Sequence, residues 1–241
     1  NRVNTGRETF ILPVDWSDTF PVFKGGLEPI QPKLVMPQGV KNETGKNGYF
    51  PNGNFTFTET FTGSSLDYRW VGVRGAREGF ISTTAEGLTI TPYETNIKAA
   101  LPTSTLFYRQ QHLNFTATTT LKYIPRTEKD LAGITCYQSE KFNYVFGVTK
   151  KAEDSYIVLQ RTEKGESSTI ASEKIEGNTP ISLRVTAEGD KYTFSYSVKD
   201  SNYQNVGGTV SGDILSTNVA GGFTGAMIGL YATTSNDAEA L

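Results

Sequence analysis

The sequence is poor in two reactive residue types, with one cysteine, Cys136, and one histidine, His112, in 241 residues. A single cysteine excludes an internal disulfide framework, and a single histidine excludes a metal site built from paired histidines. Surplus positive charge is also missing, because 23 Lys and Arg side chains stand against 25 Asp and Glu side chains. This balance argues against nucleic acid or an anionic membrane as an obligate partner. No apolar run approaches the roughly 18–20 residues that a membrane-spanning helix needs.

Residues that favour strands are abundant. The chain holds 32 threonines and 24 glycines, and 12% of its residues are aromatic, which is typical of β-structure. Its length fits one large domain or two small ones, and it can bury a core without covalent staples. The first residue is Asn1 rather than Met, and no signal-like apolar stretch follows it, so we expect a processed or cut N-terminus.

Three asparagines stand in Asn-x-Thr sequons: Asn42, Asn54 and Asn114. Such sequons accept N-linked glycans in secreted proteins. Chance alone supplies one or two sequons in a threonine-rich chain, but three of them beside almost no cysteine favour a secreted glycoprotein. We therefore expect an extracellular location and glycosylation at these positions.

The chain divides into three regions by composition. Residues 1–35 hold two short apolar segments, at 10–14 and 20–23, which cannot support a core of their own and must pack on something else. Residues 36–53 are rich in Pro, Gly, Asn and Lys, which predicts a linker. Residues 54–241 form the third and largest region.

In the third region, apolar and polar residues alternate with a period of two. The alternation covers 55–61, 113–123 and 142–148, and a block at 181–198 turns at Glu188-Gly189-Asp190, which predicts a hairpin. Strict alternation predicts strands with one face on a core and the other face in water. No window shows a helical apolar stripe. We therefore predict an all-β fold, a two-sheet sandwich of the jelly-roll kind.

The residues alone indicate no self-sufficient active site. A nucleophilic triad would have to use His112, which lies at the entry to a predicted strand, and no Gly-x-Ser-x-Gly elbow precedes a helix. Cys136 lies in an alternating strand, so we expect a packed core thiol. A metal site built from oxygen ligands stays open, although the sequence contains no Asp-x-Asp-x-Asp-Gly loop. Most acidic residues fall in turns and on polar strand faces, as on a solvated surface; they include Glu128, Asp130, Glu153, Asp154, Glu163, Glu166, Glu173 and Glu176.

An aromatic platform for sugars is an open alternative, because Tyr and Trp stack on pyranose rings while offering a polar edge. The candidates are Trp16, Tyr68, Trp70, Tyr137, Tyr203 and Tyr231. Aromatic residues are also common in the core of a sandwich, and the sequence does not decide between the two roles.

Several motifs in this order resemble glycoside hydrolase family 43. Residues 6–16 (GRETFILPVDW), followed by Phe20-Pro21-Val22, are similar to the segment that closes the five-bladed propeller of that family. Its C-terminal concanavalin A-like sandwich is similar to four segments of this chain, which are 109–112 (RQQH), 132–138 (AGITCYQ), 147–149 (GVT) and 219–231 (VAGGFTGAMIGLY). The resemblance therefore covers nearly the whole chain.

The resemblance implies a β-xylosidase or an α-L-arabinofuranosidase that hydrolyses xylan-derived oligosaccharides with inversion. Inversion needs a general acid for the leaving oxygen and a base for the attacking water. In the family these are a Glu and an Asp, a second Asp tunes the acid, and all three lie on propeller blades that precede the matched segments. We therefore expect no catalytic residue in this chain, which should be inactive alone.

The resemblance also implies partners. These are the propeller portion of the same enzyme and a xylo-oligosaccharide or arabinoxylan substrate. No cofactor is implied, and a structural calcium ion in the whole enzyme stays open.

Two features of the family carry over to residues of this sequence. Arg7 matches an arginine of the last propeller strand that hydrogen-bonds the sugar beside the catalytic carboxylates. Phe223 matches an aromatic that a sandwich loop directs toward the propeller mouth, and neighbouring glycines let the backbone approach another surface closely. One departure is at 236–241 (NDAEAL), where the family has a last strand of the type Ala-Asp-Phe-Asp-Trp-Phe. We expect that strand to be missing or diverged.

Two other functions stay open. A stand-alone carbohydrate-binding, lectin-like sandwich would need an aromatic platform and no partner for residues 1–35. A purely structural module would only stabilise the propeller.

Overall fold

The computed structural model describes residues 4–7, 10–23, 29–31, 35, 38–39, 53–74, 79–176, 180–198 and 202–234. The chain forms two compact units, one comprising Asn1–Arg7 with Thr60–Leu241 and the other Glu8–Glu59. Residues 4–7 thus share a unit with the predicted sandwich, although a long stretch of chain separates them from it. The division into 1–35, 36–53 and 54–241 stays a prediction.

The strands and helices of the described residues follow one another in a fixed order. They are β1 (Val14–Asp15), β2 (Val22–Phe23), β3 (Ile81–Thr84), β4 (Gly87–Ile90), β5 (Thr105–Arg109), β6 (Asn114–Leu121), β7 (Asp130–Ser139), β8 (Phe142–Lys151), β9 (Asp154–Glu163), β10 (Glu166–Lys174), β11 (Ile181–Glu188), β12 (Lys191–Val198), β13 (Gln204–Ser211), the 3₁₀ helix η1 (Gly212–Leu215), α1 (Thr217–Ala220) and β14 (Met227–Thr234).

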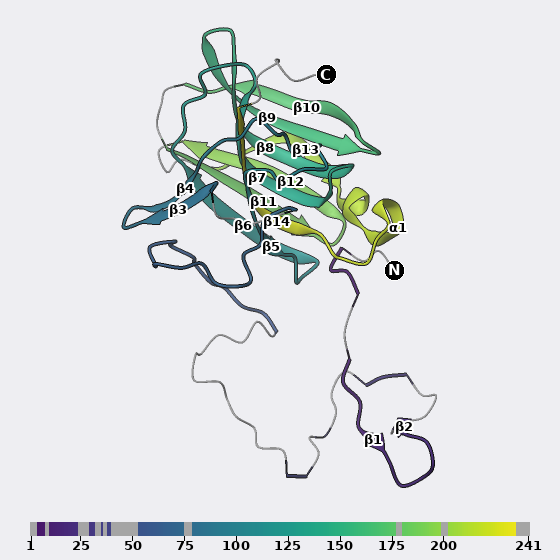
Figure 1. Ribbon diagram of the computed structural model, residues 1–241. Helices are drawn as coiled ribbons and strands as arrows, with labels where there is room; N and C mark the ends of the chain where they lie inside the picture. Colours follow the sequence, from purple (N-terminus) through teal and green to yellow (C-terminus); the bar gives the residue numbers. More distant parts are fainter. Residues whose placement is uncertain are drawn as a thin grey trace. The chain divides into compact units, whose positions relative to one another are not determined.

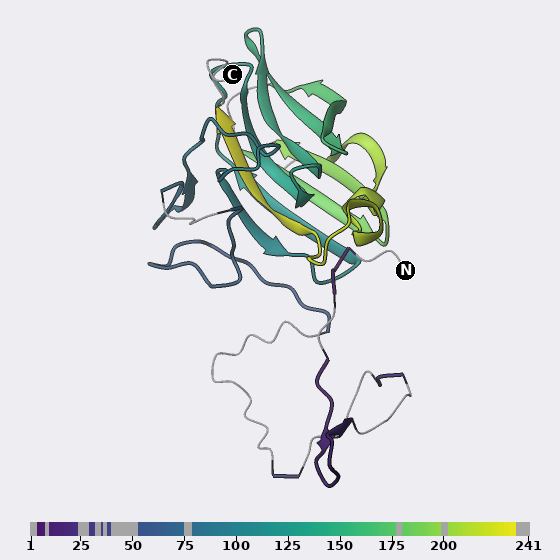
Figure 2. The ribbon, with the colours of Figure 1, turned by 45° about the vertical axis from the view of Figure 1, so that its right-hand side comes forward.

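The larger unit is a sandwich of two antiparallel sheets (Figure 1). One sheet has six strands in the order β10-β9-β8-β7-β14-β5, and the other has four in the order β13-β12-β11-β6. Strand β14 enters the first sheet between β7 and β5, and Figure 2 shows it running from beside α1 along the sheet. The predicted all-β, concanavalin A-like sandwich is confirmed. That closing strands of a five-bladed propeller precede it stays a prediction.

The main core lies between the two sheets. Leu183 and Val185 of β11 and Phe194 of β12 are fully buried, and they pack in one cluster with Phe146 of β8 and Leu159 of β9. Burial along β6 and β11 alternates residue by residue, as the period-two pattern predicts. The predicted strand at 113–123 and the predicted hairpin at 181–198 are confirmed by β6 and by the pair β11–β12.

A second core covers the outer face of the six-stranded sheet. Val71 and Phe107 exchange two backbone hydrogen bonds, of 2.9 and 2.8 Å, which tie the preceding chain to β5. Ile97 packs on this face with Val145. The expectation that the strand at 142–148 has one wet face is therefore wrong, because Val145 and its neighbours on that face are buried as well. Periodicity cannot reveal a segment that covers a sheet from outside.

The predicted strand at 55–61 is also wrong. The described residues 53–62 lie in no ladder. Phe61 has a φ of 57°, which interrupts an extended chain. Its ring instead lies 5.1 Å from that of Trp70, so aromatic contacts replace strand pairing there.

The smaller unit contains the short antiparallel pair β1–β2, with Val14 opposite Phe23. Several large apolar side chains of this unit are solvent-exposed, including Ile11 at 88% and Trp16 at 74%. Exposed apolar groups of this size are typical of a surface that another part covers. Among the described helices, none has the length and apolar character to cross a membrane.

Candidate functional site

The loop between α1 and β14 presents Phe223, whose side chain is 67% exposed. Gly221 and Gly222 open this loop with φ of 74° and 76°, a region that side chains with a Cβ rarely adopt. Gln138, at the end of β7, donates from Nε2 to the carbonyl of Gly221 at 3.0 Å and to that of Thr224 at 3.5 Å. The six-stranded sheet therefore holds the loop at both ends of the exposed ring.

The segment 4–7 lies along this loop. Asn4 is buried, and its Nδ2 donates to the Tyr192 hydroxyl at 3.2 Å and to the Gly212 carbonyl at 3.0 Å. The carbonyl of Asn4 accepts a hydrogen bond of 2.7 Å from the N–H of Ala226. The N-terminal segment is thus joined to the residue that precedes β14, and to Tyr192 and Gly212, by hydrogen bonds within one unit.

The approach of the two backbones requires glycine on both sides. Gly6 pairs with Thr224 in an antiparallel bridge. A Cβ on Gly6 would lie 2.4 Å from the nitrogen of Gly225, and a Cβ on Gly225 would lie 2.4 Å from the carbonyl carbon of Thr5. Neither contact can be relieved by a side-chain movement, because the atoms met are backbone atoms.

Arg7 and Phe223, the two site residues predicted from the sequence, are brought together. The N–H of Arg7 donates to the Phe223 carbonyl at 3.3 Å, and the Arg7 guanidinium carbon lies 3.8 Å from the centre of the Phe223 ring. Stacking on the ring face leaves the edge of the planar guanidinium free to direct N–H donors at hydroxyl pairs or a carboxylate. The pair therefore presents a hydrogen-bond donor and an apolar surface side by side, and both side chains are exposed.

A series of hydrogen bonds between buried groups supports the two segments that carry the Arg7–Phe223 pair. The Tyr192 hydroxyl, which accepts from Asn4, donates to Gln110 Oε1 at 2.9 Å. Gln110 in turn donates from Nε2 to the carbonyl of His112 and from its backbone N–H to the carbonyl of Ala226. Burial raises the pKa of Tyr192, so the hydroxyl stays protonated and keeps donating. Sequence reasoning missed Asn4 and Gln110 as support, since single amides carry no periodic signal.

The other reactive candidates have structural roles. Cys136 is fully buried, which confirms the packed core thiol. Half-buried His112 precedes β6, where its carbonyl is the acceptor just described. The placement of Asp130 on a solvated surface is wrong, because it is 2% exposed.

The Asp130 carboxylate caps a turn. It accepts hydrogen bonds from the N–H groups of Arg126 and Thr127 and from the hydroxyls of Thr127 and Thr234, at 2.7 to 3.2 Å. Burial alone would raise its pKa, but these hydrogen bonds together hold the pKa below its ordinary value. Asp67 likewise has a pKa lowered to about 2, chiefly by its side-chain hydrogen bond with Arg69. Both shifts thus come from local partners within the fold.

The aromatic candidates separate into buried and exposed groups. Tyr137 and Tyr231 are buried at 5% and 3% exposure, so they cannot form a platform. Tyr68 and Trp16 are exposed. The other two candidates have rings that contact neighbouring side chains. Trp70 packs against Phe61 and Tyr108. The guanidinium carbon of Arg184 lies 3.4 Å from the centre of the Tyr203 ring.

Two of the three sequons fall on described residues. Asn54 and Asn114 are exposed, and Asn114 Oδ1 accepts a hydrogen bond of 2.8 Å from the N–H of Gly189. Asn42 lies outside the described residues, as does the segment 236–241 where a diverged last strand is expected.

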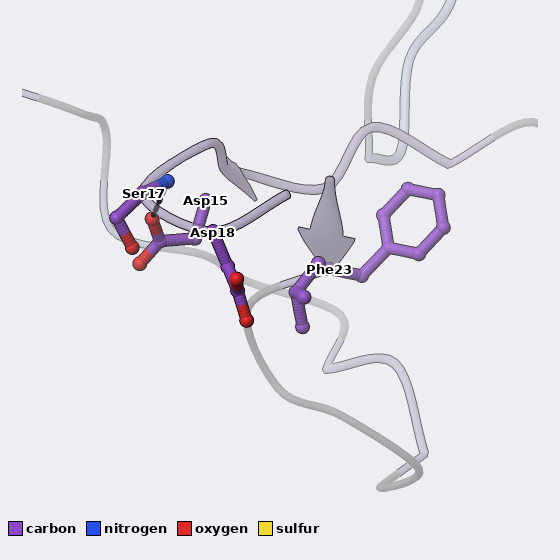
Figure 3. A pocket seen from close by; sticks show the side chains of 5 residues that line it. Asp15, Ser17, Asp18 and Phe23 are labelled. Carbon is purple, nitrogen blue, oxygen red and sulfur yellow. Dashed lines mark hydrogen bonds between the residues drawn. The ribbon is translucent and has the colours of Figure 1, made fainter. Parts of the chain in front are cut away.

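A hollow of about 320 Å³ lies in the β1–β2 hairpin (Figure 3). Its acidic groups are committed to the turn: Asp15 Oδ1 accepts from the N–H of Ser17 at 2.9 Å, and Asp18 Oδ1 accepts from that of Thr19. Figure 3 shows the Phe23 ring directed away from them. No three His, Cys, Asp or Glu side chains converge on a metal-sized space in the part of the chain that the structure describes.

Comparison with known proteins relates this geometry to a family. Residues 58–240 match the family described as beta xylosidase C-terminal concanavalin A-like domain. The resemblance indicated by the sequence motifs is thereby confirmed. A crystal structure of a GH43_12 protein retrieved from a capybara gut metagenome is 47% identical, with a TM-score of 0.87, over 97% of this chain and 45% of that one.

Curated relatives are longer than this chain. A non-reducing end alpha-L-arabinofuranosidase of Bacteroides ovatus is 28% identical over 243 residues, which cover 97% of this chain and 43% of that protein. A xylosidase/arabinosidase of Butyrivibrio fibrisolvens is 27% identical over 241 residues, covering 97% and 44%. The chain thus spans less than half the length of these two curated relatives.

Proposed function

Because the chain belongs to the family of β-xylosidase C-terminal concanavalin A-like domains, we propose that it is the C-terminal part of a xylan-degrading β-xylosidase or α-L-arabinofuranosidase. Two named relatives carry those activities, and each is more than twice as long as the segment matched. The catalytic carboxylates then belong to the additional, propeller-forming portion, which is the partner of this chain. The substrate class is a xylo-oligosaccharide or arabinoxylan.

The role that we propose for this chain is to complete and narrow the sugar-binding pocket of that enzyme. The observation that carries the proposal is the stacking of Arg7 on the exposed ring of Phe223 at 3.8 Å. A ring that holds the guanidinium in one orientation lowers the entropy lost when it binds hydroxyls. The pair then limits the pocket to short chain ends, while chemistry proceeds by inversion on the propeller side.

The test is a Phe223→Ala change in the full-length enzyme. We expect KM for an aryl glycoside to rise about five- to thirty-fold, since the variant loses about 1–2 kcal/mol of positioning and contact. A matched control is Tyr68→Ala, which removes another exposed aromatic beside an arginine, with the Arg69 guanidinium carbon 5.7 Å from its ring centre. Unchanged KM and kcat in Phe223→Ala would remove the pair from the pocket.

The lectin-like alternative has less support. Two of its six platform candidates, Tyr137 and Tyr231, are buried. The smaller unit exposes large apolar side chains, as expected of a part that packs against more protein.

We also propose that the enzyme is secreted and carries glycans at Asn54 and Asn114, with Asn42 as a third acceptor. The exposure of the first two side chains supports this. At Asn114 the hydrogen bond engages Oδ1, which leaves Nδ2 for the glycan. Intact-mass measurement before and after enzymatic deglycosylation tests it, and an unchanged mass would contradict it.

A further inference from the structure

A groove of about 320 Å³ lies on the outer face of the six-stranded sheet. Its floor is formed by side chains of the second core, among them Leu131, Val145 and Tyr231, each of which is at most 8% exposed. The loop Asn96–Lys98 forms one wall. The N–H of Ile97 donates to the Tyr231 hydroxyl at 3.0 Å, so this wall is fixed to the floor. The volume is at the lower end of the range that binds small molecules.

The opposite side of the groove is polar. It is lined by Gln160 and Thr162 of β9 and by Ser167 of β10. The hydroxyls of Thr162 and Ser167 lie 2.8 Å apart and share one hydrogen bond. The Gln160 amide adds two donors and one acceptor group. The groups that this side offers a ligand are therefore an amide and hydroxyls, which suit the hydroxyl-bearing edge of a sugar ring.

The charges at the groove favour an anion. Lys98 and Lys129 both line it, together with Glu128. Glu128 keeps its negative charge while its Oε1 accepts a hydrogen bond of 2.8 Å from the N–H of Ala152, so the two ammonium groups outnumber the one carboxylate. Within the described residues, the structure gives the Lys98 ammonium no hydrogen bond or ion pair. A bound carboxylate would supply the partner that this exposed ammonium lacks.

We propose that this groove binds a saccharide unit that carries a carboxylate, a uronic acid. The groove is distinct from the Arg7–Phe223 pair. Phe223 precedes Met227, the first residue of β14, whereas Thr233, which lines the groove, lies near the other end of that strand. About 20 Å of strand separates Met227 from Thr233. That a uronate-substituted xylan is the natural source of this unit rests on the proposed function. That the groove binds a uronic acid does not rest on it. The experiment tests these two statements separately.

The experiment titrates the 241-residue chain with methyl glucuronide and with methyl glucoside and follows the amide NMR signals of the chain. The two glycosides differ only at C6, which is a carboxylate in the first and a hydroxymethyl group in the second. We expect saturable shifts of Gln160 and Lys98 with the glucuronide, at about millimolar Kd. The glucoside should bind at least ten-fold more weakly. A parallel titration uses a glucuronate-substituted xylo-oligosaccharide and its unsubstituted counterpart, and tighter binding of the substituted one supports xylan as the source.

Two variants locate the site. Lys98→Met should weaken glucuronide binding about ten-fold, whereas Lys191→Met, an exposed lysine of the other sheet, should leave it unchanged. Gln160→Leu should weaken both methyl glycosides. Equal binding of glucuronide and glucoside, no saturable shifts, or an unaffected Lys98→Met variant would each overturn the proposal. The absence of hydrolysis by the full-length enzyme would contradict the proposed function only. It would leave this proposal standing, since the titration measures binding of glycosides to the 241-residue chain.

Discussion

Gly225→Ala tests whether the close contact between the N-terminal segment and the loop holds the Arg7–Phe223 pair. The new Cβ would lie 2.4 Å from the carbonyl carbon of Thr5, so the two backbones must separate. Separation loses the hydrogen bonds from Ala226 to Asn4 and from Arg7 to Phe223, each contributing about 0.5–1.5 kcal/mol. Stacking of the guanidinium adds about 0.5–1 kcal/mol, so the local loss is about 1.5–4 kcal/mol.

The assay is native-state amide hydrogen exchange at Ala226. Because about 1.4 kcal/mol corresponds to a factor of ten, we expect its protection to fall by about ten- to a thousand-fold. The control is Gly63→Ala, where a Cβ meets nothing closer than 3.6 Å and protection at Ala226 should not change. Undiminished protection in Gly225→Ala would show that the segment is held by something other than this contact.

Three further predictions concern the sandwich itself. Asp130→Ala should lower the free energy of unfolding by about 2–4 kcal/mol. Because the folded-state pKa of Asp130 is lowered, its contribution to stability is present above about pH 4 and is lost as pH falls below that value. Urea unfolding at several pH values measures this, and an equal stability difference between wild type and variant at pH 2 and pH 7 would contradict it. Tyr231→Phe should cost about 1–3 kcal/mol in the same assay, because it leaves the Ile97 N–H without its acceptor at 3.0 Å, and a loss below 0.5 kcal/mol would argue against that bond. Burial raises the pKa of the Cys136 thiol, so a thiol reagent at about pH 8 should label it only on unfolding, and rapid stoichiometric labelling of the native chain would show otherwise.

The sandwich could be predicted where one strand face is dry and the other wet. The alternation at 113–123 and 181–198 corresponds to β6 and to the β11–β12 hairpin. It misled at 142–148, since the second core buries the outward residues of β8 too. It also misled at 55–61, where Phe61 adopts a positive φ and packs on Trp70. Period alone does not encode which chain segments cover a sheet.

The two site residues could be predicted individually, but their contact with each other could not. Arg7 and Phe223 were indicated by resemblance to a family, not by spacing, because residues at opposite ends of the chain share no periodic relation. Their contact depends on β14 entering the sheet between β7 and β5 and on Asn4 being buried beside Tyr192. Both facts belong to the tertiary fold, which local patterns do not specify.

One assay decides whether this chain is the non-catalytic part of a glycosidase, as we propose. It measures hydrolysis of an aryl xyloside and an aryl arabinofuranoside by the 241-residue chain alone and by the same chain joined to the proposed propeller portion. We expect no turnover by the chain alone and turnover of at least one substrate by the joined protein. Appreciable turnover by the chain alone would contradict it.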